Sequence, residues 1–390
     1  YAWGANNLGQ QGRGEVGGGT TLAPTKLATE SRFLTISTPS ASTSSSQQRV
    51  WALDSTHRAW GWGAGSAYAW GTGNDDASNR PTAEQFSLPT SVDVVDIAAG
   101  SSHSLALTED YDLFAFGANG QGQLGDGTTA PSTTPKLVDA HYADRLAQVS
   151  IGGGFVTALS ISGAYLASGK NSAGQLGLEG VANQSTPQVG GNFVQVSAGS
   201  DHTLAIDRDG KVWAWGANAL GQLGNGNTTQ SDEPIQVSIP WVGPGAHAVS
   251  VSAGSRFSLA LDNFGNVYAW GNNDNFQLGV ESPTYRSAAA VVGQATGIVA
   301  IAAGESSSFA VTANGDLMAW GNNSSGQLAE PATVAKTAQP QTYTASSPFR
   351  QVSAGTDFAT AIDDLGRLWG WGGKAGNGTG AQTSTPTLIA

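Results

Sequence analysis

Side chains capable of acid–base chemistry recur at one place in an internal repeat of this chain. Asp201, Glu305 and Asp357 each lie one or two residues after a repeated glycine. Converging carboxylates can serve as the acid and base of a glycosidase or a lyase. These three are the only candidates for that enzymatic alternative, and no G-x-S-x-G turn or phosphate-binding loop accompanies them. We therefore predict no catalytic residues and a non-enzymatic protein.

The residues that usually bind metal ions are sparse and badly spaced for that purpose. The chain has no cysteine, which excludes thiolate sites and disulfides. Its five histidines lack metal-ligand spacing; they are His57, His103, His141, His202 and His247. The turn Asp207–Gly210 has too few oxygen ligands for calcium and is typical of a hairpin. We predict no metal and no cofactor.

The three residues after each repeated glycine differ between copies, which is typical of a binding rim. The predicted partner-binding residues there are Asp201, Arg256, Glu305, Asp357, His103 and His202. Phenylalanine replaces the histidine in other copies, so these two histidines alternatively pack inward as wedge fillers. Trp241, in the irregular loop 240–245, is either a partner anchor or a plug that folds back over its own repeat.

Composition narrows the class of protein. Of the 390 residues 54 are glycine and only 12% are charged, which disfavours long helices and favours short strands with tight turns. Asp plus Glu number 29 against 17 Lys plus Arg, a net charge of -12, so nucleic acid and anionic membranes are poor partners. No apolar stretch is long enough to insert into a membrane. The first residue is not Met, and we expect a processed, exported bacterial protein at the cell surface or outside the cell.

A repeat of about 52 residues organises the chain. Each copy has an Ala-Gly-type turn, a Trp-Gly about seventeen residues later, and then an N-x-x-G-Q-L-G loop, weakened in the copies that start at Asn272 and Asn322. The structural glycines are Gly100, Gly152, Gly199, Gly254, Gly304 and Gly355, and the structural tryptophans are Trp3, Trp62, Trp215, Trp270, Trp320 and Trp371. Every copy contains four strand candidates, which predicts the antiparallel blades of a propeller.

The motifs A-G-x-x-H-[ST]-L-A, D-G-x-V-[WY]-A-W-G and N-x-x-G-Q-L-G, nearly complete in 196–224, resemble the regulator of chromosome condensation repeat family. The resemblance implies an all-β, seven-bladed β-propeller across residues 1–390. We expect an N-terminal half-repeat over 1–28, a degenerate repeat over 29–90 and six well-formed repeats over 91–390. An eighth blade remains the alternative.

That family includes a nucleotide exchange factor for a small GTPase, a plant photoreceptor, a secreted bacterial inhibitor and scaffold modules, so the fold does not choose among them. Bulk properties favour the exported bacterial type. We predict a binding or structural propeller that presents blade-end loops to another protein or to a larger surface assembly. Self-association through unpaired blade edges is a further option. The alternative is a guanine-nucleotide exchange or regulatory factor for a small GTPase.

Overall fold

The computed structural model describes residues 2–4, 21–25, 33–37, 49–54, 56–63, 70–71, 80–86, 88–89, 93–100, 102–138, 145–180, 182–330, 334–344, 347–365, 367–372 and 383–388. Within these residues all regular secondary structure is β-strand, which confirms the all-β prediction. The side chains that the structure describes begin at residue 51, after the first three strands.

Among the described residues, consecutive strands pair antiparallel into seven four-stranded sheets, plus one two-stranded pair, β1 with β2. The early strands are β1 (Ala2–Gly4), β2 (Thr21–Thr25), β3 (Phe33–Ser37), β4 (Arg49–Asp54), β5 (Ala59–Gly63), β6 (Arg80–Phe86), β7 (Val94–Ala99), β8 (His103–Thr108), β9 (Leu113–Gly117) and β10 (Ser132–Leu137). The middle strands are β11 (Leu146–Ile151), β12 (Phe155–Ser160), β13 (Ala164–Gly169), β14 (Gln184–Asn192), β15 (Gln195–Ala198), β16 (His202–Ile206), β17 (Val212–Gly216), β18 (Ser231–Gln236), β19 (Ala248–Ala253) and β20 (Phe257–Asp262). The last strands are β21 (Val267–Asn272), β22 (Tyr285–Val291), β23 (Ile298–Ala303), β24 (Ser307–Thr312), β25 (Leu317–Asn322), β26 (Lys336–Tyr343), β27 (Phe349–Ala354), β28 (Phe358–Asp363), β29 (Leu368–Gly372) and β30 (Thr383–Leu388).

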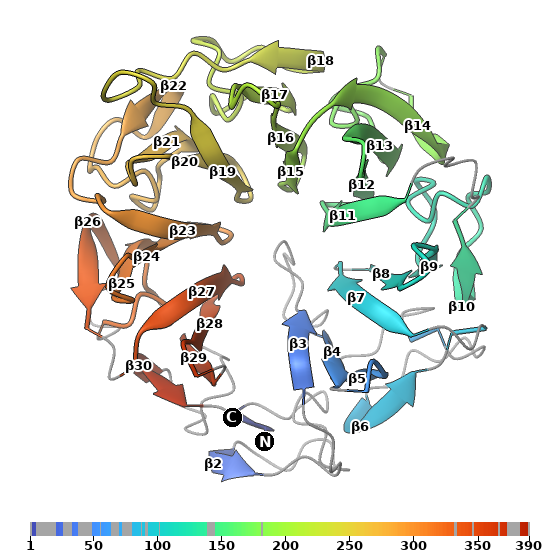
Figure 1. Ribbon diagram of the computed structural model, residues 1–390. Coiled ribbons are helices and arrows are strands. Elements are labelled where there is room, and N and C mark those ends of the chain that lie inside the picture. The colour runs from blue at the N-terminus through green and yellow to red at the C-terminus, as the bar shows by residue number, and fades with distance from the viewer. Residues whose placement is uncertain are drawn as a thin grey trace.

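The sheets stand around a common axis as the blades of a β-propeller (Figure 1). The first strand of each sheet lies nearest the axis and the fourth lies at the rim, as β19 and β22 show. Both chain ends lie between the blade β27–β30 and the blade β3–β6. Each blade is built from one copy of the sequence repeat, so the predicted propeller architecture is confirmed.

The repeated glycines line the crowded centre of the ring. A Cβ on Gly199 would lie 2.6 Å from the carbonyl oxygen of Gly254, and one on Gly254 would lie 2.8 Å from that of Gly304. The same contact joins Gly152 to Gly199 and Gly304 to Gly355. Glycine is needed here because neighbouring turns touch backbone to backbone, and none of these positions has a left-handed φ.

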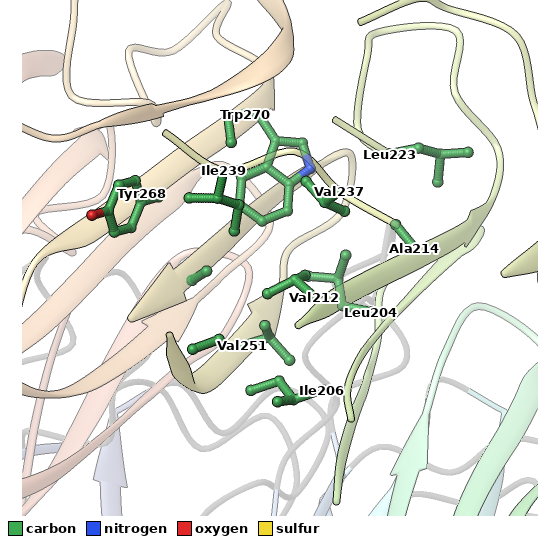
Figure 2. Packing of buried hydrophobic residues seen from close by; sticks show 13 residues of the cluster. Leu204, Ile206, Val212, Ala214, Leu223, Val237, Ile239, Val251, Tyr268 and Trp270 are labelled. Carbon is green, nitrogen blue, oxygen red and sulfur yellow. The ribbon is translucent and has the colours of Figure 1, made fainter. Parts of the chain in front are cut away.

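Four of the repeated tryptophans, Trp215, Trp270, Trp320 and Trp371, each bind their blade to the one before it. Trp270 is fully buried among Leu204, Val212 and Ile239 of the preceding blade and its connection (Figure 2). Its Nε1–H donates to the carbonyl of Gln222 over 2.9 Å. Three other pairs repeat this bond: Trp215 with Gln175, Trp320 with Gln277 and Trp371 with Gln327. A hydrogen-bonded indole can be buried without leaving a polar group unpaired.

The N-x-x-G-Q-L-G loop is held by its buried asparagine. Asn218 donates to the carbonyls of Asn227 and Thr229 and accepts a bond from the Leu223 N–H. The equivalent asparagines in the two weakened copies are Asn273 and Asn323, which corrects the predicted starts at Asn272 and Asn322 by one residue. This loop fixes the glutamine carbonyl that the next blade's tryptophan binds.

Candidate functional site

The propeller has two ends with different chemistry. The turns between first and second strands and the N-x-x-G-Q-L-G loops form one end, which we call the turn end. The hairpins between second and third strands and the connections between blades form the other, the hairpin end. The strands alternate in direction within each blade, so these two sets of loops lie on opposite faces.

Charged side chains of neighbouring blades meet at the turn end. Asp201 Oδ1 lies 2.7 Å from Lys170 Nζ, from the preceding blade. Glu305 lies near Arg256 and Asp357 and receives a hydrogen bond from the side chain of Thr356. Burial raises the pKa of Glu305 and the charge of Asp357 raises it further, while the bond from Thr356 and the charge of Arg256 oppose the rise.

The structure therefore groups four of the predicted rim residues, Asp201, Arg256, Glu305 and Asp357, on one end of the ring. Arg256 is exposed and the three carboxylates are half-buried. Charges that vary from blade to blade within the same turn can distinguish partners by electrostatic complementarity. Their role as partner contacts remains a prediction.

His103 and His202 do not reach this surface, because both side chains are fully buried. His202 Nε2 lies 3.0 Å from Ser258 Oγ of the next blade, and Ser258 itself donates to the Gln222 carbonyl. The imidazole must then donate to the serine, which leaves the unprotonated Nδ1 in the interior without a hydrogen-bond partner. Burial lowers the pKa of His202 to about 4. Both histidines therefore pack inward between blades, as the wedge-filling alternative predicted. Because they are buried, they cannot contact a partner directly.

Trp241 lies at the opposite, hairpin end, so the structure does not bring it together with the charged rim. Its half-buried ring packs edge-on against Tyr268 of the next blade, with the centroids 5.1 Å apart. The Tyr268 hydroxyl accepts a bond from the Val242 N–H, which holds the loop down. Trp241 therefore folds back onto the propeller, as the plug alternative predicted. Its indole covers the junction of two blades and not its own blade alone.

The hairpin end also exposes a set of aliphatic residues that the sequence analysis missed. Val95, Val249 and Val299 are 43%, 50% and 57% exposed, each at the second position of a first strand. The pairing register shifts there in every case, which indicates a β-bulge. A bulge turns one extra side chain out of the sheet. Val194, just before β15, is 55% exposed in the same place.

The structural tryptophans Trp215, Trp270, Trp320 and Trp371 are fully buried in the blade junctions. The side chains of Trp3 and Trp62 lie outside the described ones. Gly100 also belongs to the crowded ring, because a Cβ on it would lie 2.8 Å from the side chain of Ile151. The indoles are therefore part of the framework.

The described residues contain no group of three or more acidic, histidine or cysteine residues arranged to bind a metal ion. No helix among them is long and apolar enough to cross a lipid bilayer.

The fold and the loops at the two faces of the ring define a β-propeller built from repeats, with a constant framework and variable loops. The RCC1-like domain model matches residues 135–390, and the regulator of chromosome condensation (RCC1) repeat matches 94–123 and 56–107. The chain belongs to the RCC1 repeat family, as its motifs predicted.

Curated relatives share the repeat over parts of their own length. The ultraviolet-B receptor UVR8 of Arabidopsis thaliana is 29% identical over 304 residues, 75% of this chain and 65% of the receptor. The E3 ubiquitin-protein ligase HERC2 of Homo sapiens is 28% identical over 284 residues, 72% of this chain but only 6% of the ligase. The chain thus spans less than two thirds of these relatives.

Solved structures share the fold across nearly the whole chain. Human WBSCR16 has a TM-score of 0.76 at 21% identity, with 93% of this chain and 99% of that one covered. Prp20p from Saccharomyces cerevisiae, whose structure was described with its binding to Gsp1p and histones, has a TM-score of 0.76 at 20% identity, with 93% and 92% covered. Identities this low support the fold alone.

Proposed function

We propose that this chain is a non-enzymatic propeller that binds another protein through the loops at its ends. One observation carries the proposal. The glycines, tryptophans and loop asparagines repeat from blade to blade, while the two residues after the repeated glycine vary in charge: Asp201, Arg256 and Asp357 stand two residues after it and Glu305 stands one residue after it. A rigid ring with variable polar side chains suits recognition, because little conformational entropy is lost when it binds.

Relatives support a binding role in general terms. Prp20p is described as binding Gsp1p and histones, and in another structure it is bound by Kap60. The match to HERC2 covers 6% of that ligase, so the ligase named there gives no reason to propose an enzyme here. The partner class proposed for this chain is protein.

We further propose a single domain across 1–390 with seven complete blades and the N-terminal pair as an extra half-repeat. Support comes from the seven four-stranded sheets and from the register of β1 with β2. Ala2 pairs with Thr25 and Gly4 with Thr21, as Gly370 pairs with Thr387 and Gly372 with Thr383 in the third and fourth strands of the last blade. The strand edges of such a half-repeat can pair with the strands of another copy, which offers a route to self-association or to a larger assembly.

An exported, bacterial, cell-surface location remains part of this proposal. It is supported by the low content of charged residues. Fractionation of the native source with an antibody against the intact chain tests it; recovery with cytosolic markers alone would refute it.

Nucleotide exchange on a small GTPase is the second candidate, favoured by the fold shared with Prp20p. Release of a fluorescent GDP analogue from Gsp1p, with and without the intact chain, tests this activity. No acceleration is expected at micromolar chain, and a concentration-dependent acceleration would make exchange the function.

The binding proposal is tested by affinity capture from the native source, followed by cross-linking and mass spectrometry. A charge-reversed variant, Arg256→Glu with Glu305→Arg, serves as the control because both residues lie at the turn end. A defined protein that cross-links to a propeller end and is lost with this variant supports a turn-end partner. Capture of nothing but the chain itself would overturn the proposal.

A further inference from the structure

A groove opens at the hairpin end between the blades β15–β18 and β19–β22. It has a volume of about 440 Å³. Val194, Ile206 and Val249 give it an apolar lining, and Arg208 and His247 stand among its polar groups. Both valines expose about half their surface, so their methyl groups are accessible to a ligand.

The negative charges around this groove are already matched within the chain. Asp207 accepts bonds from the Trp213 indole and from the N–H groups of Asp209 and Lys211. Partial burial works to raise the pKa of Asp207, but these bonds and the Lys211 charge hold it below its ordinary value. Asp209 pairs with Lys211 Nζ at 3.3 Å.

Arg208 has no such match. Its guanidinium donates one bond, to the Ser162 carbonyl, and no carboxylate among the described residues pairs with it. Guanidinium carries five N–H donors in a fixed fork, so most of them remain for a ligand. A carboxylate fits that fork and also restores local charge balance.

His247 adds an acceptor beside the apolar lining. Its Nδ1 lies 3.0 Å from the Gly245 carbonyl, which can only accept, so Nδ1 donates and Nε2 of the neutral ring is an acceptor. Gly210 makes room for this ring, because a Cβ there would lie 2.8 Å from it. An acceptor of this kind suits a peptide N–H.

We propose that the groove binds a segment of a partner protein that presents an aliphatic side chain and a carboxylate two residues apart. In an extended segment, residues two apart face the same side. The aliphatic group lies between Val194 and Val249, the carboxylate pairs with Arg208, and a backbone N–H donates to His247. This inference rests on the proposed protein-binding function and names the partner chemistry for one end of the ring.

The test uses the intact chain with isotope-labelled valine and isoleucine methyl groups. The probe is the acetylated, amidated peptide Ser-Leu-Ser-Glu-Ser, followed by nuclear magnetic resonance. Val194, Val249 and Ile206 methyl signals should shift with added peptide while Val299, the matching bulge residue of the next blade, stays unchanged. Replacing the peptide's Glu by Gln should weaken binding about fivefold, and Lys should weaken it further.

Variants separate charge from packing. Arg208→Gln should abolish the preference for Glu over Gln, whereas the control Arg350→Gln, at an exposed bulge position of another blade, should keep it. Unmoved groove methyls, equal affinity for the Lys peptide, or an unchanged preference in Arg208→Gln would each overturn the inference. If the groove stays silent while affinity capture yields a partner cross-linked elsewhere, this inference fails and the proposed function stands. Peptide binding without any captured protein would count against the function instead.

Discussion

The bond between each tryptophan and the preceding blade gives a quantitative prediction, because one blade lacks a second donor. The Gln277 carbonyl accepts from both Trp320 Nε1 and Ser308 Oγ, at 2.9 and 2.8 Å. The Gln327 carbonyl accepts from Trp371 Nε1 at 2.7 Å. The residue that corresponds to Ser308 in that blade is Ala359, which has no hydroxyl.

Trp320→Phe and Trp371→Phe remove the same atoms from two fully buried sites. The packing loss should therefore be similar, about 1–3 kcal/mol in each. Trp371→Phe also strands a buried carbonyl, which costs about 1–3 kcal/mol, whereas Trp320→Phe leaves the serine bond in place. We expect Trp371→Phe to lower the free energy of unfolding by about 1–2 kcal/mol more than Trp320→Phe does.

Chemical denaturation followed by far-ultraviolet circular dichroism measures this difference without relying on indole fluorescence. Two double variants complete the test. Ala359→Ser should restore most of the difference in the Trp371→Phe background. Ser308→Ala combined with Trp320→Phe should be worse than additive by about 1–2 kcal/mol. Equal losses in the two single variants, with additive behaviour in the double, would refute the assigned role of the carbonyl.

Three further predictions concern the framework. The pKa of His202 is lowered to about 4 in the folded chain, so the unfolded chain binds more protons between about pH 6.5 and pH 4. The free energy of unfolding should therefore be highest above pH 6.5 and fall by up to about 3 kcal/mol as the pH drops to 4. Unfolding curves measured over a pH series should lose this slope in His202→Phe. Gly254→Ala should destabilise by about 1–3 kcal/mol in a thermal-unfolding comparison, while Gly293→Ala, which meets no atom within 4 Å, should change stability by less than about 1 kcal/mol. Asn218→Ala should cost about 2–4 kcal/mol because two loop carbonyls and one N–H lose their partner, whereas the exposed Asn227→Ala should cost under about 1 kcal/mol; matched denaturant midpoints would contradict the loop account.

The sequence predicts the propeller well because its determinants are local and repeated. Gly254 and Trp270 hold fixed places in a repeat, and each is required by a contact to the neighbouring copy of that same repeat. Strand types and the order of the four strands follow from that repetition. The predicted start of the weakened loop is wrong by one residue because two asparagines adjoin, Asn272 and Asn273. The four-residue spacing to the glutamine, as from Asn218 to Gln222, selects Asn273, and the hydrogen bonds agree.

The candidate sites were harder to predict, because they depend on how blades face one another. Alternation along β19 would place Val249 on the same face as the buried Val251, but the bulge turns Val249 into solvent. The same spacing occurs in other blades, for example in Val299 and Ile301. It predicts an exposed valine only when the bulge is already known. The groove itself combines residues from two blades, and no linear motif encodes it.

Hydrogen exchange of the intact chain, with and without its captured partner, tests the central claim most directly. We predict slowed exchange confined to loops at a propeller end, either the turns that contain Asp201, Arg256 and Glu305 or the hairpin-end segments around Val194 and Val249. Protection limited to the fourth strands at the outer rim, or no protection at either end, would contradict a propeller that binds through its end loops.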